Sequence, residues 1–439
     1  MPSAVVRSAL LITIAAWTAV ASDPVSASAM PMPDGKHDVG VIRGEFVDSS
    51  RRLDAGDPAS GPRRLPAIVW YPAAGRAVGG APYMEGDEAA VRVPAIARNF
   101  RYTTEELHAL TSQRMNVRPG ATPARQSRGF PVVVFSHGFF LYPEQNSALA
   151  MRLASHGYIV VSIAHPGDAA DVRLEDGRIV ATRPAVPGDD PRFATTLKTL
   201  AGGQDLATSR EALTVYGEAL AATRLGRSFV EWRDDTLAVA KAIVGGNEPR
   251  ALREVLRAAH RNRLAFAGMS FGGATSATTC KLVDACRAAV NLDGQNFDPD
   301  LFDRPVGRPF LLLLSDWTRY SLFEGQPKEA DFSPNDLAYE SWSAAGRSGD
   351  VLRVRLEGIR HMGFTDLVAL LEGSKRVERV GEIGGDEALS AIGDVVLAFL
   401  DVHVREHDSV SIDRAIARHP ALKRHEPARL KKWVVGAGS

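Results

Sequence analysis

The feature that most restricts the fold is a series of short apolar runs that do not alternate with polar residues. Strands of a half-exposed sheet alternate, whereas strands of a parallel sheet covered on both faces do not. The runs are Phe130–Phe135, Tyr158–Ile163, Leu264–Ala267, Ala288–Leu292, Phe310–Leu314 and Val351–Leu356. We therefore expect a mostly parallel sheet that is buried on both faces.

Segments with helical character lie between these runs. The clearest are Glu144–His156, Phe229–Val244, Phe271–Val283 and Glu387–His403. Strands that alternate with helices in this way predict a doubly wound α/β fold with right-handed crossovers. Near the start, Val39–Val47 and Leu65–Tyr71 flank a turn, which indicates an antiparallel pair at an edge of the sheet.

Two segments are too long for ordinary connections in such a fold. They are residues 79–128 and 167–227, and we expect them to form helical or loop insertions that cap the ends of the strands. The folded domain is expected to span residues 35–405. Residues 406–439 are then a C-terminal tail on the surface.

One turn in this pattern carries a candidate nucleophile. Ser270 lies in Gly268-Met269-Ser270-Phe271-Gly272, between the run Leu264–Ala267 and the helical segment that begins at Phe271. A serine on a sharp strand-to-helix turn stands exposed above the sheet, and the helix N-terminus favours negative charge there. The motif alone is a weak signal, but this context predicts the nucleophile elbow of an α/β-hydrolase.

A serine hydroxyl needs a histidine base, and the base needs an orienting carboxylate. In this fold the nucleophile, the acid and the histidine follow one another along the chain. Among the histidines after Ser270, only His361 directly follows a strand-like run, so we expect it to be the general base. Two carboxylates, Asp293 and Asp316, end strand-like runs at suitable places, and the local sequence leaves the choice open.

The reaction also needs an oxyanion hole. One donor in this fold is the backbone N–H of the residue after the nucleophile, here Phe271, and the other comes from the loop after an earlier strand. Ser136-His137-Gly138-Phe139-Phe140 follows the run Phe130–Phe135, and Gly138 permits a turn that aims the N–H of Phe139 inward. We expect His137 to hold this loop by hydrogen bonds rather than to act as a base.

The segments that carry these motifs can be taken together. They are Ile68–Pro72, Val132–Gly138, Leu153–Val160, Gly268–Thr275 and Val290–Asp293. In this combination the chain resembles the platelet-activating factor acetylhydrolase family and its bacterial relatives. The likeness extends over most of the chain that follows the N-terminal leader.

The resemblance implies several properties. In that family the acid lies in a Leu-Asp pair after the strand that follows the elbow, which favours Asp293 over Asp316. It also implies Phe139 and Phe271 as oxyanion donors, a reaction that needs no calcium, and a preference for short or oxidised acyl groups. The chain departs from the family in the long insertion at residues 167–227 and at Met269, where histidine is frequent.

Composition and charge restrict the partners. The chain has 439 residues, 45% of them hydrophobic, with 52 Lys and Arg against 52 Asp and Glu. Without a net charge or a block of like charge, we expect no nucleic-acid or anionic-membrane partner. No run approaches the ~20 apolar residues of a membrane span, so no transmembrane segment is expected. The sequence does not indicate an oligomeric state.

The N-terminus has the pattern of an export signal. Met1–Arg7 carries one positive charge, Ser8–Val20 is almost uncharged and apolar, and Ala19-Val20-Ala21 supplies small residues, so we expect cleavage after Ala21. The protein is then periplasmic or extracellular.

The chain has only 2 cysteines, Cys280 and Cys286. Because disulfides persist outside the cytoplasm, we expect them to pair; two buried free thiols are the alternative. Two cysteines are too few for a thiolate zinc cluster.

The sequence therefore predicts an exported serine esterase with a Ser270, His361 and Asp293 triad and no cofactor or metal. The expected substrate is a small-molecule or lipid ester with a short or oxidised acyl group, including phospholipids that resemble platelet-activating factor. Alternatives that keep the serine are a dienelactone-hydrolase-like enzyme, a polyester hydrolase, a thioesterase and a peptidase. A rival of another class is a secreted binding protein on a catalytically inactive hydrolase scaffold.

Overall fold

The computed structural model describes residues 30–75, 80–184, 206–302, 304–320 and 351–425, together with residues 192, 195, 196, 199 and 339. The expected export signal, residues 1–21, lies outside the described residues. So do residues 426–439 of the expected C-terminal tail.

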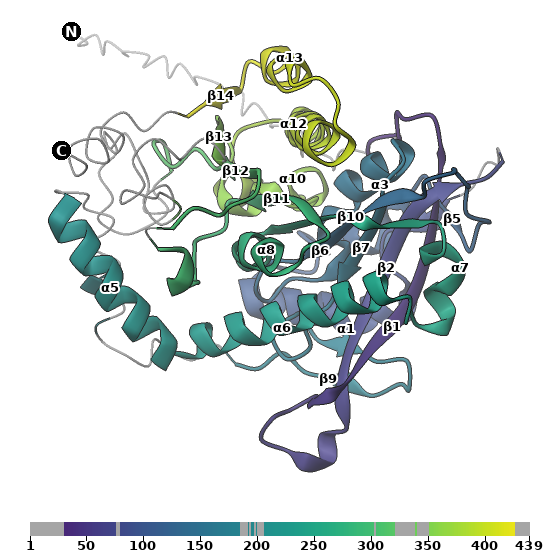
Figure 1. The fold of residues 1–439 in the computed structure, drawn as a ribbon, viewed down its shortest axis with the longest axis horizontal. Coiled ribbons are helices and arrows are strands. Elements are labelled where there is room, and N and C mark those ends of the chain that lie inside the picture. The colour runs from purple at the N-terminus through teal and green to yellow at the C-terminus, as the bar shows by residue number, and fades with distance from the viewer. Residues whose placement is uncertain are drawn as a thin grey trace, which may run out of the picture.

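A 10-stranded sheet forms the centre of the described chain, in the order β14-β13-β12-β11-β10-β6-β7-β2-β1-β5 (Figure 1). The strands from β7 through β6 and β10 to β13 are parallel, whereas β2 runs antiparallel to both β1 and β7. The expected α/β fold with a mostly parallel sheet is confirmed. The strands are β1 (Asp38–Arg52), β2 (Pro62–Ala73), β5 (Arg118–Pro119), β6 (Phe130–Ser136), β7 (Ile159–Ile163), β10 (Ala259–Met269), β11 (Cys286–Leu292), β12 (Phe310–Leu314), β13 (Val351–Leu356) and β14 (Leu422–Arg424).

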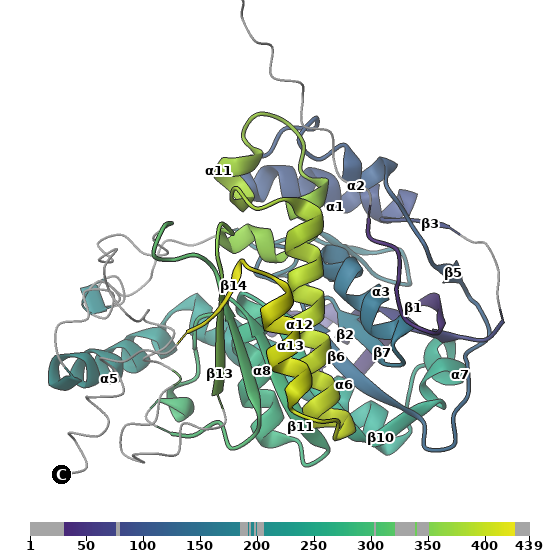
Figure 2. The same ribbon diagram turned by 90° about the horizontal axis from the view of Figure 1, so that it is seen from above.

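Helices cover both faces of the sheet, which explains why its strands are apolar without alternation. In β6, Val133 and Phe135 face the core shared with α3 (Ser147–Ser155) and α12 (Gly385–Arg405). Val132 and Val134 face the opposite core, which contains residues of α6 (Arg224–Gly245) and α8 (Phe271–Leu282). Viewed from above, α12 crosses the sheet on one side while α8 and α6 lie on the other (Figure 2). The sheet is therefore the middle layer of three.

The first insertion is only partly a cap. Its end, β5, pairs with β1 at the edge of the main sheet. Its helices α1 (Gly86–Phe100) and α2 (Ala109–Ser112) follow β3 (Ala81–Pro82) and precede β4 (Arg114–Met115). The hydroxyl of Tyr83 donates to the carbonyl oxygen of Glu144 and lies 3.1 Å from Asp366 Oδ2, so this insertion contacts the segments that carry Glu144 and Asp366.

The described parts of the second insertion form the hairpin β8 (Val172–Arg173) and β9 (Ile179–Val180), the helix α5 (Leu206–Ala222) and the start of α6. Tyr216 of α5 accepts a hydrogen bond from the Gln295 side chain at 2.7 Å, and its ring lies 6.0 Å from that of Phe302. The helix therefore packs against the segment that follows β11.

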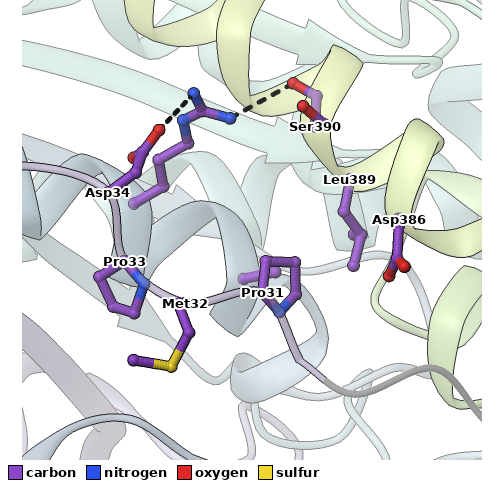
Figure 3. Close-up of a pocket in the computed structure, with 9 residues that line it drawn as sticks. Pro31, Met32, Pro33, Asp34, Asp386, Leu389 and Ser390 are labelled. Atoms are coloured by element: carbon purple, nitrogen blue, oxygen red, sulfur yellow. Dashed lines mark hydrogen bonds and ion pairs between the residues drawn. The ribbon is translucent and has the colours of Figure 1, made fainter.

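Both ends of the domain lie further out than the sequence suggested. Met30 is buried, and Asp34 pairs with Arg152 of α3 at 2.8 Å, beside a hollow of about 340 Å³ between the N-terminal segment, α3 and α12 (Figure 3). At the other end, α13 (Val410–Arg418) and β14 are part of the fold, since β14 pairs with β13 and Leu422 is buried. The expectation of a surface tail from residue 406 is therefore wrong up to residue 425: apolar contacts at Leu422 and Ile412 hold this segment to the core.

Shorter helices complete the described chain. They are α7 (Arg253–Leu256), α10 (Leu367–Leu370) and α11 (Arg376–Val380). None of the helices in the described ranges is both long enough and apolar enough to cross a membrane.

Candidate active site

The nucleophile candidate lies on a strained turn between β10 and α8. Ser270 has φ 55° and ψ −119°, a backbone conformation that costs a non-glycine residue free energy. The flanking glycines allow this turn to pack: a Cβ on Gly272 would lie 2.1 Å from the carbonyl oxygen of Ser136, and one on Gly268 would lie 2.3 Å from the Gly272 backbone. The turn lifts the Ser270 hydroxyl above the carboxyl edge of the sheet, where α8 begins.

The structure brings His361 and Asp293 to this hydroxyl. His361 follows β13, and its Nε2 lies 2.8 Å from Ser270 Oγ. Its Nδ1 lies 2.7 Å from Asp293 Oδ2. The imidazole is 38% exposed, whereas the carboxylate is fully buried. This is the order of contacts in which a buried carboxylate orients a histidine that faces both serine and substrate.

The strand end that carries Asp293 is held by its neighbours. The second carboxylate oxygen of Asp293 accepts the N–H of Ser315 at 2.8 Å, and Asn291 accepts the N–H of Gly294 at 2.6 Å. The positive φ at this strand end, 58°, belongs to Asp293 itself. Gly294 is needed for space, because a Cβ there would lie 2.1 Å from the Ser270 carbonyl oxygen.

The alternative acid, Asp316, does not contact the imidazole. Its Oδ2 accepts the N–H of Gly358 at 2.9 Å, and its Oδ1 accepts the hydroxyl proton of Thr318. Asp316 therefore joins the ends of β12 and β13 and acts on the loop that carries His361.

The two expected oxyanion donors, Phe139 and Phe271, lie on segments that meet at the nucleophile turn, since a Cβ on Gly138 would lie 3.4 Å from the Cβ of Ser270. The neighbours of Phe139 are engaged, since Gly138 donates its N–H to Gln145 Oε1 at 2.8 Å and Phe140 donates its N–H to Asp168 O at 2.8 Å. Within the described residues, the N–H groups of Phe139 and Phe271 have no protein acceptor. Two amides left open beside a nucleophile are what an oxyanion hole requires.

His137 holds the loop between these groups. It is fully buried, its Nδ1 lies 2.7 Å from the carbonyl oxygen of Gly138, and its Nε2 accepts the backbone N–H of His165 at 3.2 Å. Burial, together with the neighbouring His165, holds the pKa of His137 well below its ordinary value. A neutral imidazole with both nitrogens occupied positions the loop and does not reach substrate.

The sequence did not reveal the aromatic residues around the nucleophile. Phe139, Phe140, Phe271 and Phe297, here called the aromatic wall, come from segments far apart in the chain. The rings of Phe139 and Phe271 are 5.0 Å apart, and those of Phe271 and Phe297 are 4.9 Å apart. The guanidinium of Arg224 lies 5.5 Å from the Phe139 ring centre. The wall surrounds the oxyanion donors with apolar surface.

The remaining expectations concern cysteines and metals. Cys280 at the end of α8 and Cys286 at the start of β11 are joined by a disulfide with a Cα–Cα distance of 5.2 Å. Within the described ranges, no three His, Cys, Asp or Glu side chains are grouped so as to hold a metal ion.

Comparisons with known proteins concern the fold and the class of protein. Residues 63–174 match the family described as platelet-activating factor acetylhydrolase, isoform II. The structure is similar to that of a ferulic acid esterase from Streptomyces cinnamoneus, with a TM-score of 0.64 and 23% identity over 91% of this chain and 100% of that chain. The structural likeness shows the fold, and the family match covers β2, β6, β7 and the loop with Phe139.

The fold and the family match together define a serine ester hydrolase of the α/β-hydrolase class. Within that class, residues 63–174 are similar to the platelet-activating factor acetylhydrolase family, which supports the expected resemblance over that part of the chain.

Proposed function

We propose that this protein hydrolyses carboxylic esters through a covalent acyl intermediate on Ser270. The observation that carries the proposal is the continuous chain of contacts from Ser270 Oγ through His361 to Asp293, with distances of 2.8 and 2.7 Å. The same turn and the loop beside it carry the N–H groups of Phe139 and Phe271, which have no protein acceptor among the described residues. No other group in the reaction has to be supplied besides water.

The proposed mechanism accounts for each proton and each bond. Ser270 Oγ attacks the carbonyl carbon while His361 Nε2 takes the hydroxyl proton, and Asp293 stabilises the resulting imidazolium. The carbonyl oxygen becomes an anion held by the Phe139 and Phe271 amides. When the tetrahedral species collapses, His361 gives its proton to the leaving alcohol. A water molecule deprotonated by His361 then attacks the acyl group, the bond to Ser270 Oγ breaks, and His361 returns the proton to Oγ as the carboxylic acid leaves.

The proposed substrate is an ester with a short or oxidised acyl group, including phospholipids that resemble platelet-activating factor, met by an exported enzyme in the periplasm or the medium. The family match supports the acyl preference. The leader pattern in Met1–Ala21 supports export.

A second candidate substrate class is an ester of an aromatic acid. The aromatic wall favours it, because Phe139 and Phe297 are only partly buried and planar rings pack well against such side chains in offset or edge-to-face contacts. The similar structure from Streptomyces is named a ferulic acid esterase. Both candidate substrate classes react with the same nucleophile and differ in the acyl group of the ester.

One assay tests the nucleophile and separates the two acyl classes. Wild type and Ser270→Ala are compared on p-nitrophenyl acetate, a platelet-activating factor analogue and methyl ferulate. We expect Ser270→Ala to lower kcat by roughly four to six orders of magnitude on every substrate the wild type cleaves, because the nucleophile is gone. Circular dichroism shows whether the variant is folded. Full activity in folded Ser270→Ala would overturn the proposal.

A further inference from the structure

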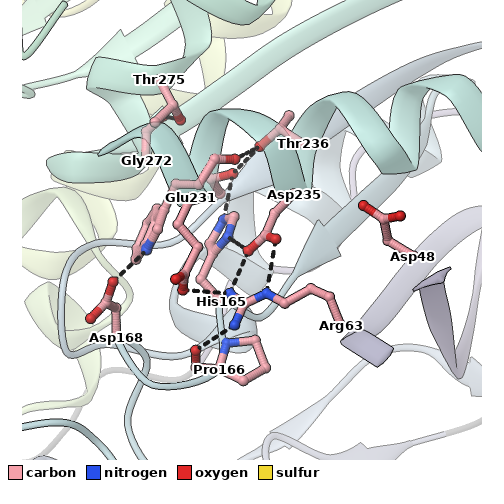
Figure 4. A network of polar contacts seen from close by, with 12 residues as sticks. Asp48, Arg63, His165, Pro166, Asp168, Glu231, Asp235, Thr236, Gly272 and Thr275 are labelled. Carbon is pink, nitrogen blue, oxygen red and sulfur yellow. Dashed lines mark hydrogen bonds and ion pairs between the residues drawn. The ribbon is translucent and has the colours of Figure 1, made fainter. Parts of the chain in front are cut away.

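A second serine, histidine and aspartate are linked in the same way elsewhere in the molecule. His165 Nε2 lies 3.0 Å from Ser136 Oγ, and His165 Nδ1 lies 2.9 Å from Asp235 Oδ2. Ser136 ends β6, His165 follows β7 and Asp235 lies on α6. Figure 4 shows the contact between His165 and the carboxylate of Asp235 as a dashed line. We call these three residues the buried relay.

The buried relay cannot attack a substrate. His165 and Asp235 are fully buried, and Ser136 is only 2% exposed. Burial lowers the pKa of His165, even though Asp235 opposes this shift. The imidazole is therefore neutral, with its Nδ1–H donated to the carboxylate and its Nε2 accepting the Ser136 hydroxyl. A fully satisfied polar network of this kind fixes geometry.

The buried relay holds the start of the loop that carries Phe139 by hydrogen bonds. Ser136 is the residue before His137, and its carbonyl oxygen packs against Gly272 of the nucleophile turn. His165 holds Ser136 through its side chain and His137 through its backbone N–H. One residue thus fixes two consecutive positions directly upstream of the oxyanion donor.

The residues that follow His165 also hold the far end of that loop by hydrogen bonds. The carbonyl oxygen of Asp168 accepts the N–H of Phe140 at 2.8 Å, and the carbonyl oxygen of Leu141 accepts the N–H of Ala170 at 2.7 Å. Phe140 itself has φ 65°, a conformation that needs such support in a non-glycine residue. The Phe139 amide therefore lies between two positions of the loop that are held by hydrogen bonds, one before it and one after it.

Helix α6 and strand β2 in turn contact residues 165–168. Arg63 of β2 forms a two-point contact with Asp235, at 3.0 and 2.7 Å, and donates to the carbonyl oxygen of Pro166 at 3.0 Å (Figure 4). The ring of Trp232 on α6 stacks on His165 with centroids 3.8 Å apart, and its N–H donates to the Asp168 carboxylate. These contacts connect β2 and α6 to residues 165–168, and so to the oxyanion loop.

We propose that Ser136, His165 and Asp235 are positioning residues that set the direction of the Phe139 amide and so the strength of the oxyanion hole. The inference rests on the proposed ester hydrolysis at Ser270. Helix α6, which begins at the end of the second insertion, thereby contributes to catalysis through Asp235 without touching the substrate. Loss of the relay reduces stabilisation of the transition state more than it reduces ground-state binding of the ester.

The variant Ser136→Ala tests this with the smallest change in volume. Its kcat on p-nitrophenyl acetate is measured per active site, counted by titration with a fluorophosphonate, so that unfolded protein does not contribute. We expect kcat to fall by roughly 10-fold with KM changed less than about twofold, since a misplaced oxyanion donor costs transition-state binding. Affinity for a trifluoromethyl ketone, which places an oxyanion in the hole, should fall by about the same factor.

The matched control is Ser155→Ala, which removes another buried hydroxyl, one that donates to Arg152 O at the far end of α3. Its kcat per active site should stay within about twofold of wild type. The double variant with Ser136→Ala and His165→Asn should have a kcat within about twofold of that of His165→Asn alone. Both substitutions break the same contact, so their effects are not additive.

The outcomes separate the two proposals. If wild type hydrolyses no ester, the proposed function fails. If wild type is active but Ser136→Ala keeps its kcat per active site and its affinity for the ketone, the positioning role is overturned.

Discussion

Two regions of this molecule contain the same chain of contacts with different surroundings. In the exposed relay, His361 lies 2.8 Å from Ser270 Oγ and 2.7 Å from Asp293 Oδ2. In the buried relay, His165 lies 3.0 Å from Ser136 Oγ and 2.9 Å from Asp235 Oδ2. A hydrogen-bonded serine, histidine and aspartate are therefore not sufficient to define a nucleophile.

The surroundings make the difference. Ser270 lies on a strained turn at the start of α8 and next to two unoccupied amides, whereas Ser136 ends a regular strand in the core. The aspartates also differ. Asp235 is paired with the guanidinium of Arg63, which fixes it as part of an ion pair, whereas Asp293 takes the N–H of Ser315 and leaves its other oxygen to His361. Exposure, backbone strain and open donors distinguish a reactive relay from a structural one.

Removing the charge from the exposed relay should have the largest effect. Asp293→Asn replaces an acceptor by an amide and leaves His361 in the wrong tautomer, so we expect kcat to fall by roughly 10⁴-fold on p-nitrophenyl acetate. Asp316→Asn is the matched control, because the amide oxygen still accepts the N–H of Gly358. A severe loss in Asp316→Asn with none in Asp293→Asn would show that the acid has been misassigned.

Removing the charge from the buried relay should act mainly on stability. Asp235→Asn leaves the buried Arg63 with less compensation, so we expect the free energy of unfolding to fall by about 3 kcal/mol at neutral pH, measured by urea denaturation. The comparison of the two relays fails if Asp235→Asn is as stable as wild type while Asp293→Asn is the variant that unfolds.

The stability effect should depend on pH in a defined direction. Burial opposes ionisation of Asp235, but the Arg63 charge and the His165 hydrogen bond outweigh it and lower the pKa below the ordinary 3.8. A carboxyl with a lowered pKa stabilises the fold above its unfolded-state pKa and loses this contribution as the pH falls through the folded-state value. The difference between wild type and Asp235→Asn should therefore be constant near neutral pH and shrink in acid below about pH 4.

Much of the fold and of the exposed relay follows from local sequence. Apolar runs without alternation predicted the parallel strands, and the position of Ser270 between a strand and a helix predicted the turn. The choice of Asp293 needed the family resemblance, because Asp316 ends a strand in the same way. The structure brings Asp293 and not Asp316 to His361.

The buried relay and the aromatic wall could not be predicted from the sequence, because their members come from distant segments. Ser136 and Asp235 are 99 positions apart in the numbering and meet only when α6 packs under β6. The packed C-terminal segment was missed for the same reason, since β14 is short and pairs only after the sheet has formed. The role of Asn291 had a local signal, because Asn-Leu-Asp-Gly is rich in turn residues.

The most direct test of the central claim is to locate the reactive serine among the two relays. The native protein is treated with a fluorophosphonate, digested with trypsin and analysed by mass spectrometry. The account predicts one adduct, on Ser270 in the peptide of residues 264–281, and none on Ser136 in the peptide of residues 129–152. An adduct on Ser136, or undiminished labelling of folded Ser270→Ala, would contradict it.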